Sequence, residues 1–220
     1  MNNKTLSFIV ALLFYSFKVA AQVQVSKEPR HKKALENKYV RLLDVYIQPG
    51  DTSLFHIHST PSVFLHFTTT VVCSQIKGKE WATGKNTQGN TSYRSFLNDT
   101  LVHRVSNCDT VPFHVTDVEL LSAYKPDRKL EPLPFTIMFE NEKVFAYQLT
   151  ESSFNKNLIS HRGPMVAELV AGEEVVYYDA VQKRSSTIKT GKYLYINPGS
   201  TFYFKASEKE TIMLVLFEIK

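Results

Sequence analysis

Short apolar segments recur along almost the whole chain, and clusters of Gly, Pro, Asn and Ser separate them. The segments are rich in β-branched and aromatic residues, and none of them keeps a helical period over three turns. The clearest segments are Tyr39–Ile47, Val63–Val72, Val111–Leu120, Val144–Leu149, Met165–Leu169, Val175–Tyr178, Tyr193–Ile196, Thr201–Phe204 and Thr211–Ile219. Such period-two and short apolar runs are typical of strands that bury one or both faces. The pattern therefore predicts an all-β chain of many short strands.

The two halves of the chain resemble each other. His58–Val63 aligns with His161–Val166 at an offset of 103 residues, and Val118–Leu120 aligns with Phe217–Ile219 at an offset of 99 residues. A deletion of four residues in the second half reconciles the two offsets. The alternative is chance similarity among β-rich segments. Repetition over this length favours duplication of a whole small barrel over a solenoid.

The N-terminus has the pattern of an export signal. Lys4 supplies the positive start, Leu6–Tyr15 the apolar core, and Val19–Ala21 a small-residue cleavage site before Gln22. This apolar run is too short to span a bilayer, although an uncleaved N-terminal anchor is the alternative. We expect a periplasmic or secreted protein with no membrane span after removal of the signal.

Charge and composition complete the domain layout. Removal of residues 1–21 takes away two lysines and no acid, so the formal net charge falls from +5 to +3, too small a surplus to indicate a nucleic-acid partner. A basic cluster after the cleavage site is interpreted as a solvated arm, and it contains Lys27, Arg30, His31, Lys32 and Lys33. The predicted layout is a signal peptide (1–21), a basic arm (22–35), a first domain (36–123), a linker (124–135) and a second domain (136–220).

Three histidines are the candidate metal ligands. His56 and His58 are two residues apart, so in a strand they share one face. His103 lies in a second strand-like run. Imidazoles placed in this way can converge on one ion, with N–metal distances of about 2.1 Å. We predict a buried mononuclear site in the first half, and ordinary core or surface histidines are the alternative.

The spacing around the first two histidines resembles the first motif of the cupin superfamily. That motif has a Gly, five residues, His-x-His, three or four residues and a Glu. Gly50, His56 and His58 fit it, whereas the Glu position falls on Ser62 or Val63. The carboxylate ligand of the family is therefore absent from its usual place.

The second cupin motif ends Gly-x-x-His-x-x-x-Asn, and the chain is similar to it at His103 and Asn107, with Thr100 in place of the Gly. In the second half Phe202 replaces the motif histidine, and Ile159 stands where His56 would lie. The resemblance implies a bicupin, with two tandem jelly-roll β-barrels of which the first is metal-competent and the second degenerate. A closed barrel of this size holds a small ligand.

Three imidazoles without a carboxylate favour Fe(II), Zn, Cu, Ni or Co over Mg or Ca. Three-His cupin sites resemble those of thiol dioxygenases, which implies one divalent transition metal and a dioxygenase-like oxidoreductase acting on a small organic substrate. The alternatives are a non-catalytic small-molecule-binding cupin, a metal-dependent isomerase or hydrolase, and a structural protein with vestigial histidines. Whether the protein is an enzyme stays open. Exposed strand edges make a homodimer a further candidate.

Other polar residues are candidates for the cavity wall. Ser62 stands at the motif's Glu position and would leave room for water or substrate, and His66 shares its strand parity. For His66 the alternative is a histidine packed in the core. Glu119 matches Glu218 in the repeat, which favours a structural role for both.

Cys73 and Cys108 would meet an oxidising environment after export. The spacing leaves open whether they pair.

Overall fold

The computed structural model describes residues 22–155, 158–206 and 211–220, so the predicted signal at residues 1–21 lies outside the described residues. Within the described residues nearly all regular structure is strand, and the helical elements are two 3-10 turns, η2 (Val25–Lys27) and η3 (Glu151–Ser153). The all-β prediction is confirmed. None of the helices in the described part of the chain is long and apolar enough to cross a membrane.

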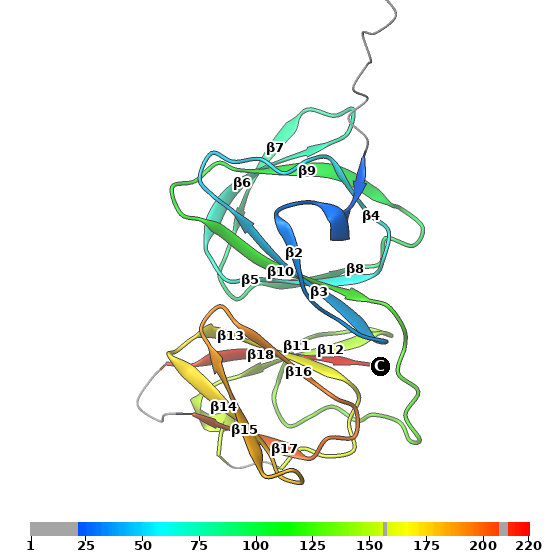
Figure 1. Cartoon of the computed structure of the whole chain (residues 1–220), viewed down its shortest axis with the longest axis vertical. Coiled ribbons are helices and arrows are strands. Elements are labelled where there is room, and N and C mark those ends of the chain that lie inside the picture. The colour runs from blue at the N-terminus through cyan, green and yellow to red at the C-terminus, as the bar shows by residue number, and fades with distance from the viewer. Residues whose placement is uncertain (1–21, 156–157, 207–210) are drawn as a thin grey trace, which may run out of the picture.

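The first barrel consists of two five-stranded sheets that face each other (Figure 1). One sheet has the order β1-β4-β9-β6-β7 and the other β2-β3-β10-β5-β8. The strands are β1 (Val23–Gln24), β2 (His31–Glu36), β3 (Val40–Ile47), β4 (His56–His58), β5 (Ser62–His66), β6 (Thr70–Ile76), β7 (Trp81–Asn86), β8 (Thr91–Arg94), β9 (Leu101–Asn107) and β10 (Phe113–Leu120).

The second barrel repeats this arrangement, with the orders β11-β12-β18-β13-β16 and β15-β14-β17. Its strands are β11 (Thr136–Glu140), β12 (Val144–Leu149), β13 (Met165–Ala171), β14 (Glu174–Asp179), β15 (Arg184–Lys189), β16 (Tyr193–Ile196), β17 (Phe202–Ala206) and β18 (Met213–Ile219). β3, β10 and β5 of the first barrel thus correspond to β12, β18 and β13 of the second. The fold is two tandem jelly-roll barrels, as predicted.

The strand register agrees with both offsets of the repeat. His56 on β4 lies directly opposite His103 on β9. Adding 103 to the first number and 99 to the second gives Ile159 and Phe202, and these two residues form an isolated antiparallel bridge. The same pair of backbone positions is therefore paired in each barrel, which supports duplication over chance similarity.

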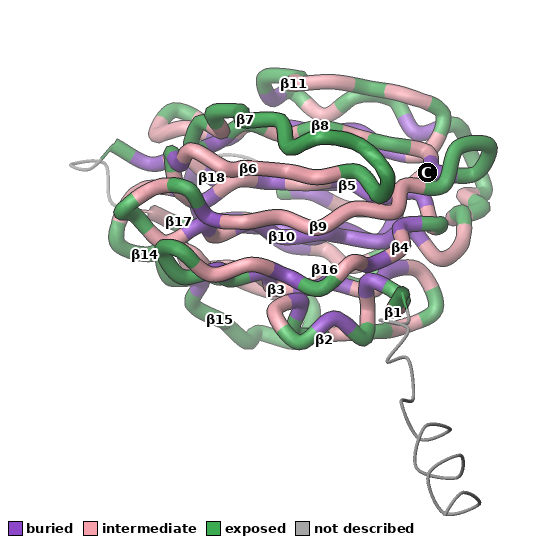
Figure 2. Tube along the Cα trace, turned by 90° about the horizontal axis from the view of Figure 1, so that it is seen from above, coloured by how far each residue is buried: buried purple, intermediate pink, exposed green. Residues whose placement is uncertain are grey.

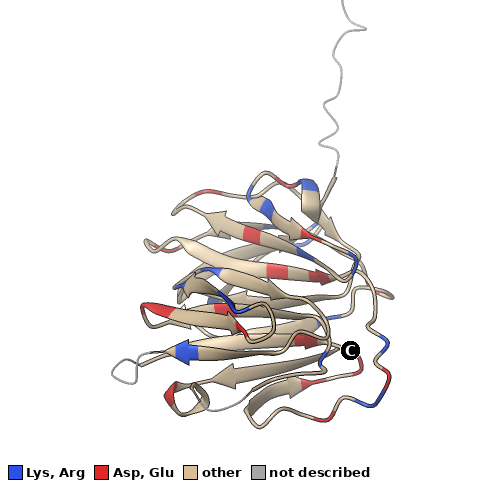
Figure 3. Cartoon of the chain, turned by 60° about the horizontal axis from the view of Figure 1, so that its bottom comes forward, with Lys and Arg blue, Asp and Glu red and all other residues tan. Residues whose placement is uncertain are grey.

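The two barrels pack sheet against sheet through an apolar layer (Figure 1). The first barrel contributes residues such as Leu42 and Val118, and the second contributes residues such as Val166 and Phe217, all fully buried. Figure 2 shows β10 and β18 coloured as buried along most of their length. In the view of Figure 3, acidic and basic residues are interspersed over the strands and loops of both barrels.

Residues 22–35 do not form the solvated arm that we predicted. β1 pairs in parallel with β4, and β2 pairs antiparallel with β3. Val25, Glu28 and His31 are buried, whereas the lysines between and around them are exposed and Arg30 is half-buried. The segment therefore forms part of the barrel wall, with these three side chains on its inner side. We call residues 23–31 the N-terminal strap.

Cys73 and Cys108 form a disulfide, which answers the question that the sequence left open. It joins β6 to the residue that directly follows β9.

Candidate metal centre

Four histidine rings gather at one end of the interior of the first barrel. His56 and His58 point inward from β4 and are 0% and 3% exposed. His103 reaches the same place from β9, and His31 reaches it from the start of β2. The i, i+2 spacing and the antiparallel register bring the predicted trio together.

The separations between these rings suit a shared ion. Ring centroids of His56, His58 and His103 lie 4.6–5.1 Å apart. Nε2 of His58 is 3.1 Å from Nε2 of His103. Two nitrogens that each bind one ion at about 2.1 Å are themselves about 3.0–3.4 Å apart in octahedral or tetrahedral geometry. The observed distance falls in that range.

The sequence analysis missed His31 as a site residue. Its ring centroid is 4.5 Å from that of His56, and His31, His56 and His58 can each present a ligand nitrogen within 4.8 Å of the others. The neighbouring lysines indicated a solvent-exposed segment at this point of the sequence. A register shift between Lys33 and Leu35 also breaks the inward–outward alternation of β2. The short spacing between Glu28 and His31, which now form an ion pair, was the available signal.

Two of the rings have a firm hydrogen bond on Nδ1. His56 donates from Nδ1 to the carbonyl of Leu54 at 2.8 Å, and Nδ1 of His31 lies 2.7 Å from Oε2 of Glu28. A neutral imidazole has one N–H, so a ring that donates from Nδ1 keeps a lone pair on Nε2. Nε2 of His56 is buried and has no partner among the described residues.

The other two rings have weaker contacts on the same atom. Nδ1 of His103 is 3.3 Å from the hydroxyl of Ser74, and Nδ1 of His58 is 3.4 Å from Oδ2 of Asp117. On all four histidines an oxygen therefore stands beside Nδ1. This arrangement favours Nε2 as the ligand atom of His56, His58 and His103, the three predicted metal residues.

Burial keeps two of these rings neutral. Burial, together with the neighbouring imidazoles, lowers the pKa of His56 to about 3 and that of His103 to about 2. For Glu28 burial acts in the opposite direction, but hydrogen bonds from His31 and from the amide of Leu54 bring its pKa down to about 2. Neutral imidazoles are the form that binds metal.

A cavity of about 220 Å³ opens beside the rings. Its wall is mostly apolar and includes Phe64, Val72, Val105, Phe113 and Val115. Its polar groups besides the four histidines are His66, Ser74, Asn86 and Asp117. His66 therefore lines the cavity. Burial lowers its pKa to about 4, and its Nδ1 has no partner among the described residues.

Ser62 does not line this cavity. It is fully buried at the start of β5, opposite Glu119, and its hydroxyl donates to the carbonyl of Thr60 at 3.2 Å. Our expectation that Ser62 leaves room for a ligand is wrong, because Phe64 and His66 are the β5 residues that reach the cavity.

Asp117 is a second cavity residue that the sequence analysis missed. It lies on β10, is 1% exposed, and neither of its oxygens has a hydrogen-bond partner among the described residues. An acidic residue within the predicted strand Val111–Leu120 was the available signal, although Glu119 in the same strand gives the same signal.

Glu119 and Glu218, by contrast, each pair with an arginine of their own barrel. Arg41 donates to Glu119 at 2.8 Å, and Arg162 donates to both oxygens of Glu218 at 2.8 and 2.5 Å. These pairs agree with the structural role that the repeat indicated.

The second barrel has no comparable site in its described residues. Ile159 and Phe202 fill the positions of His56 and His103 and are 4% and 1% exposed. His161, the only histidine after residue 135, is exposed. The barrel interior is packed apolar core.

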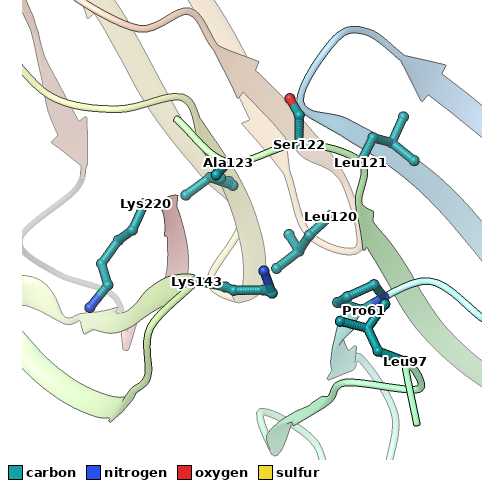
Figure 4. A pocket seen from close by; sticks show the side chains of 9 residues that line it. Pro61, Leu97, Leu120, Leu121, Ser122, Ala123, Lys143 and Lys220 are labelled. Atoms are coloured by element: carbon teal, nitrogen blue, oxygen red, sulfur yellow. The ribbon is translucent and has the colours of Figure 1, made fainter. Parts of the chain in front are cut away.

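A separate cavity of about 260 Å³ lies at the junction of the two barrels (Figure 4). Pro61, Leu97, Leu120 and Ile219 line it together with backbone and aliphatic parts of nearby residues. The ammonium group of Lys220 points away from the other labelled side chains in Figure 4 and pairs with Glu140 at 2.9 Å. The candidate chemistry therefore belongs to the histidine cavity.

No protein-family model matches the chain, and no curated protein is significantly similar to it in sequence. Solved structures do match. A cupin 2 conserved barrel domain protein from Leptotrichia buccalis is 11% identical, with a TM-score of 0.54, over 91% of this chain and 100% of that one. The salicylate 1,2-dioxygenase of Pseudoaminobacter salicylatoxidans is 12% identical, with a TM-score of 0.53, over 82% and 71%.

The oxalate decarboxylase of Bacillus subtilis, which has Mn(II) centres, is 10% identical, with a TM-score of 0.51, over 83% of this chain and 69% of that one. At these identities the similarity establishes the fold. The chain is therefore a protein of the cupin fold, with two tandem jelly-roll barrels and a histidine cluster in the first that could hold a metal ion.

Proposed function

We propose that the first barrel binds one divalent transition-metal ion through His56, His58 and His103, with His31 as a fourth ligand. The observation that carries this proposal is the convergence of four imidazole rings, three buried and His103 half-buried, each with an oxygen beside its Nδ1. Such outer contacts fix the orientation and tautomer of metal-binding histidines in general. A cluster of core histidines without this role would leave Nε2 of His56 buried and unpaired at a cost in stability.

The donor set selects a class of metal. Imidazole nitrogen suits Fe(II), Co, Ni, Cu and Zn, whereas Mg and Ca prefer oxygen ligands. Because neutral imidazoles bring no charge, the ion would keep its full positive charge within the ligand shell. That charge would attract an anionic or easily deprotonated group of a ligand.

We further propose an oxidoreductase of the dioxygenase type that acts on a small organic substrate. A redox-active ion would supply the electron transfer. Phe64, Phe113 and the valines of the cavity would bind the apolar part of the substrate and exclude water, while His66 and Asn86 offer hydrogen bonds. The shared fold with a salicylate dioxygenase supports this class.

Export to the periplasm or the exterior is part of the proposal. Two features support it: the signal-like pattern at residues 1–21 and the disulfide between Cys73 and Cys108. Disulfides are rare in reducing compartments.

The test is the metal content of protein purified without a histidine tag, measured by elemental analysis. We expect about one transition-metal ion per chain of the wild type. His56→Ala and His103→Ala should lose that ion, and His31→Ala should lose it in part. The matched control His161→Ala should keep the wild-type metal content. Equal loss in the control, or a metal-free wild-type protein after incubation with each candidate ion, would contradict the site. Oxygen uptake with a panel of thiols, diketones and hydroxybenzoates then separates an oxidoreductase from a binding protein.

A further inference from the structure

The carboxylate of Asp117 is the least compensated buried acid beside the histidine cluster. It is 1% exposed, and both oxygens lack a hydrogen-bond partner among the described residues. No lysine or arginine of the described residues forms an ion pair with it, whereas Glu28 has Arg30 at 3.5 Å and Glu119 has Arg41 at 2.8 Å. A buried carboxylate without a partner is costly, and buried charges are generally paired or near a metal.

The group that faces Asp117 is one of the proposed ligands. Oδ2 of Asp117 is 3.4 Å from Nδ1 of His58, and that Nδ1 has no other partner among the described residues. Nε2 of the same ring is 3.1 Å from Nε2 of His103. If His58 binds an ion through Nε2, its proton must stay on Nδ1, and Asp117 is the acceptor in place to receive it.

His58 is also held from a second side. The ring of Phe96 stacks on it with a centroid distance of 5.0 Å and an interplanar angle of 21°. Phe96 is buried and has a φ of 55°, which is rare for a bulky residue and persists where the surroundings enforce it. Stacking fixes the plane of the His58 ring but leaves its tautomer open, so the tautomer depends on Asp117.

The position of Asp117 explains how the site manages without the usual carboxylate. The cupin motif places a Glu at Ser62 or Val63 on β5, where this chain has none. Asp117 lies on the neighbouring strand β10, opposite Phe64 of β5. A carboxyl group is thus retained at the cavity, one strand away and next to His58.

We propose that Asp117 is a positioning residue that orients His58 through Nδ1 and supplies the negative charge that the histidine ligand set lacks. This inference rests on the proposed metal site. It predicts that the apo and metal-bound proteins respond to loss of the carboxylate in opposite directions. Without metal, removal of an unpaired buried acid relieves a cost. With metal, the same change removes an attraction and a hydrogen-bond acceptor.

The experiment titrates apo protein with Co(II) and Zn(II) and compares Asp117→Asn and Asp117→Leu with the wild type. We expect an affinity lower by roughly 10–100-fold for Asp117→Asn, a larger loss for Asp117→Leu, and a changed Co(II) absorption spectrum in both. The apo variants should melt at or above the temperature of the apo wild type, and should gain less on metal addition. If Asp117 had only a structural role, its replacement would lower the melting temperature of the apo protein.

The matched control is Glu119→Gln, an acid-to-amide change two residues further along the same strand, next to Arg41 rather than a histidine. It should bind Co(II) with the affinity and spectrum of the wild type. Wild-type affinity and spectrum in Asp117→Asn would overturn the inference while the metal site stands. An absence of Co(II) and Zn(II) binding by the wild type would instead overturn the proposed function, and the inference with it.

Discussion

The two barrels share the strand order of one five-stranded sheet, but their interiors are filled differently. In the first, His56 faces His103 across β4 and β9, and a cavity opens beside them. In the second, Ile159 faces Phe202 at the equivalent positions, and the interior is closed by packed apolar side chains. The barrel fold does not require histidines at these two positions, because the second barrel forms with Ile159 and Phe202 there. The first barrel therefore gives up apolar packing at the positions where a ligand-binding site would be.

What the barrels keep in common supports this reading. Glu119 and Glu218 occupy equivalent positions, and each pairs with an arginine. The arginines come from different places, Arg41 from β3 and Arg162 from the segment before β13, so the two barrels share the buried acid and solve its pairing separately. Asn37 and Asn141 each accept backbone hydrogen bonds in the turn before β3 and β12. The asparagine turn and the buried glutamate are thus duplicated, whereas the histidine cluster is confined to the first barrel, and His161 at the position of His58 is exposed.

The largest expected effect comes from giving the first barrel the residues of the second. In the double variant His56→Ile and His103→Phe, we expect metal binding to become undetectable while the barrel stays folded, because the same two residues pair in the second barrel. The adjoining cavity can accept part of the larger ring. Metal content and circular dichroism are the measurements, and a folded variant that still binds metal stoichiometrically would contradict the assignment of ligands.

The opposite change should damage the second barrel. Phe202 is 1% exposed and contacts Tyr177 and Phe204 in the core, so Phe202→Ala should destabilise the protein by about 3–5 kcal/mol. His103→Ala in the apo protein should cost less, because His103 already borders a cavity. Chemical denaturation measures both. Equal losses would show that the interior of the first barrel is packed as tightly as that of the second.

The sequence was sufficient for the fold and for three of the clustered rings. Alternating apolar runs predicted the strands, and the spacing of His56, His58 and His103 predicted their convergence. It was not sufficient for Asp117, because β10 lies between the cavity and the second barrel. A strand buried on both faces shows no alternation, so Thr116 and Asp117 are both buried and the sequence does not tell which way each points.

His31 was out of reach for a different reason. Its neighbours are lysines whose charges lie outside the barrel, so local composition indicated solvent. Its burial depends on contacts distant in sequence. Glu28 accepts the amide of Leu54 at 3.0 Å, and Arg30 forms an ion pair with Asp51. Such contacts appear only when the strap has folded against the barrel.

The smallest expected effect concerns the layer between the barrels, at a position where one copy has an apolar residue and the other an acid. β5 of the first barrel has Leu65, and the repeat places Glu168 at the equivalent position of β13, fully buried. Thr116 donates a hydrogen bond to Oε2 of Glu168 at 2.6 Å, and Oε1 has no partner among the described residues. Burial, together with the nearby Asp44, raises the pKa of Glu168 from its ordinary 4.5 to about 8.

Because the folded state holds a proton that the unfolded state releases, the protonated Glu168 contributes stability that is complete below pH 4.5 and is lost as the pH rises to about 8. Glu168→Gln removes this dependence and can still accept the hydrogen bond from Thr116. We expect the free energy of unfolding of the variant to match that of the wild type at pH 4 and to exceed it by on the order of 1 kcal/mol near pH 8. Denaturation at both pH values measures the difference, and parallel stability curves would show that Glu168 is charged in the folded protein and that the interface has adapted to it.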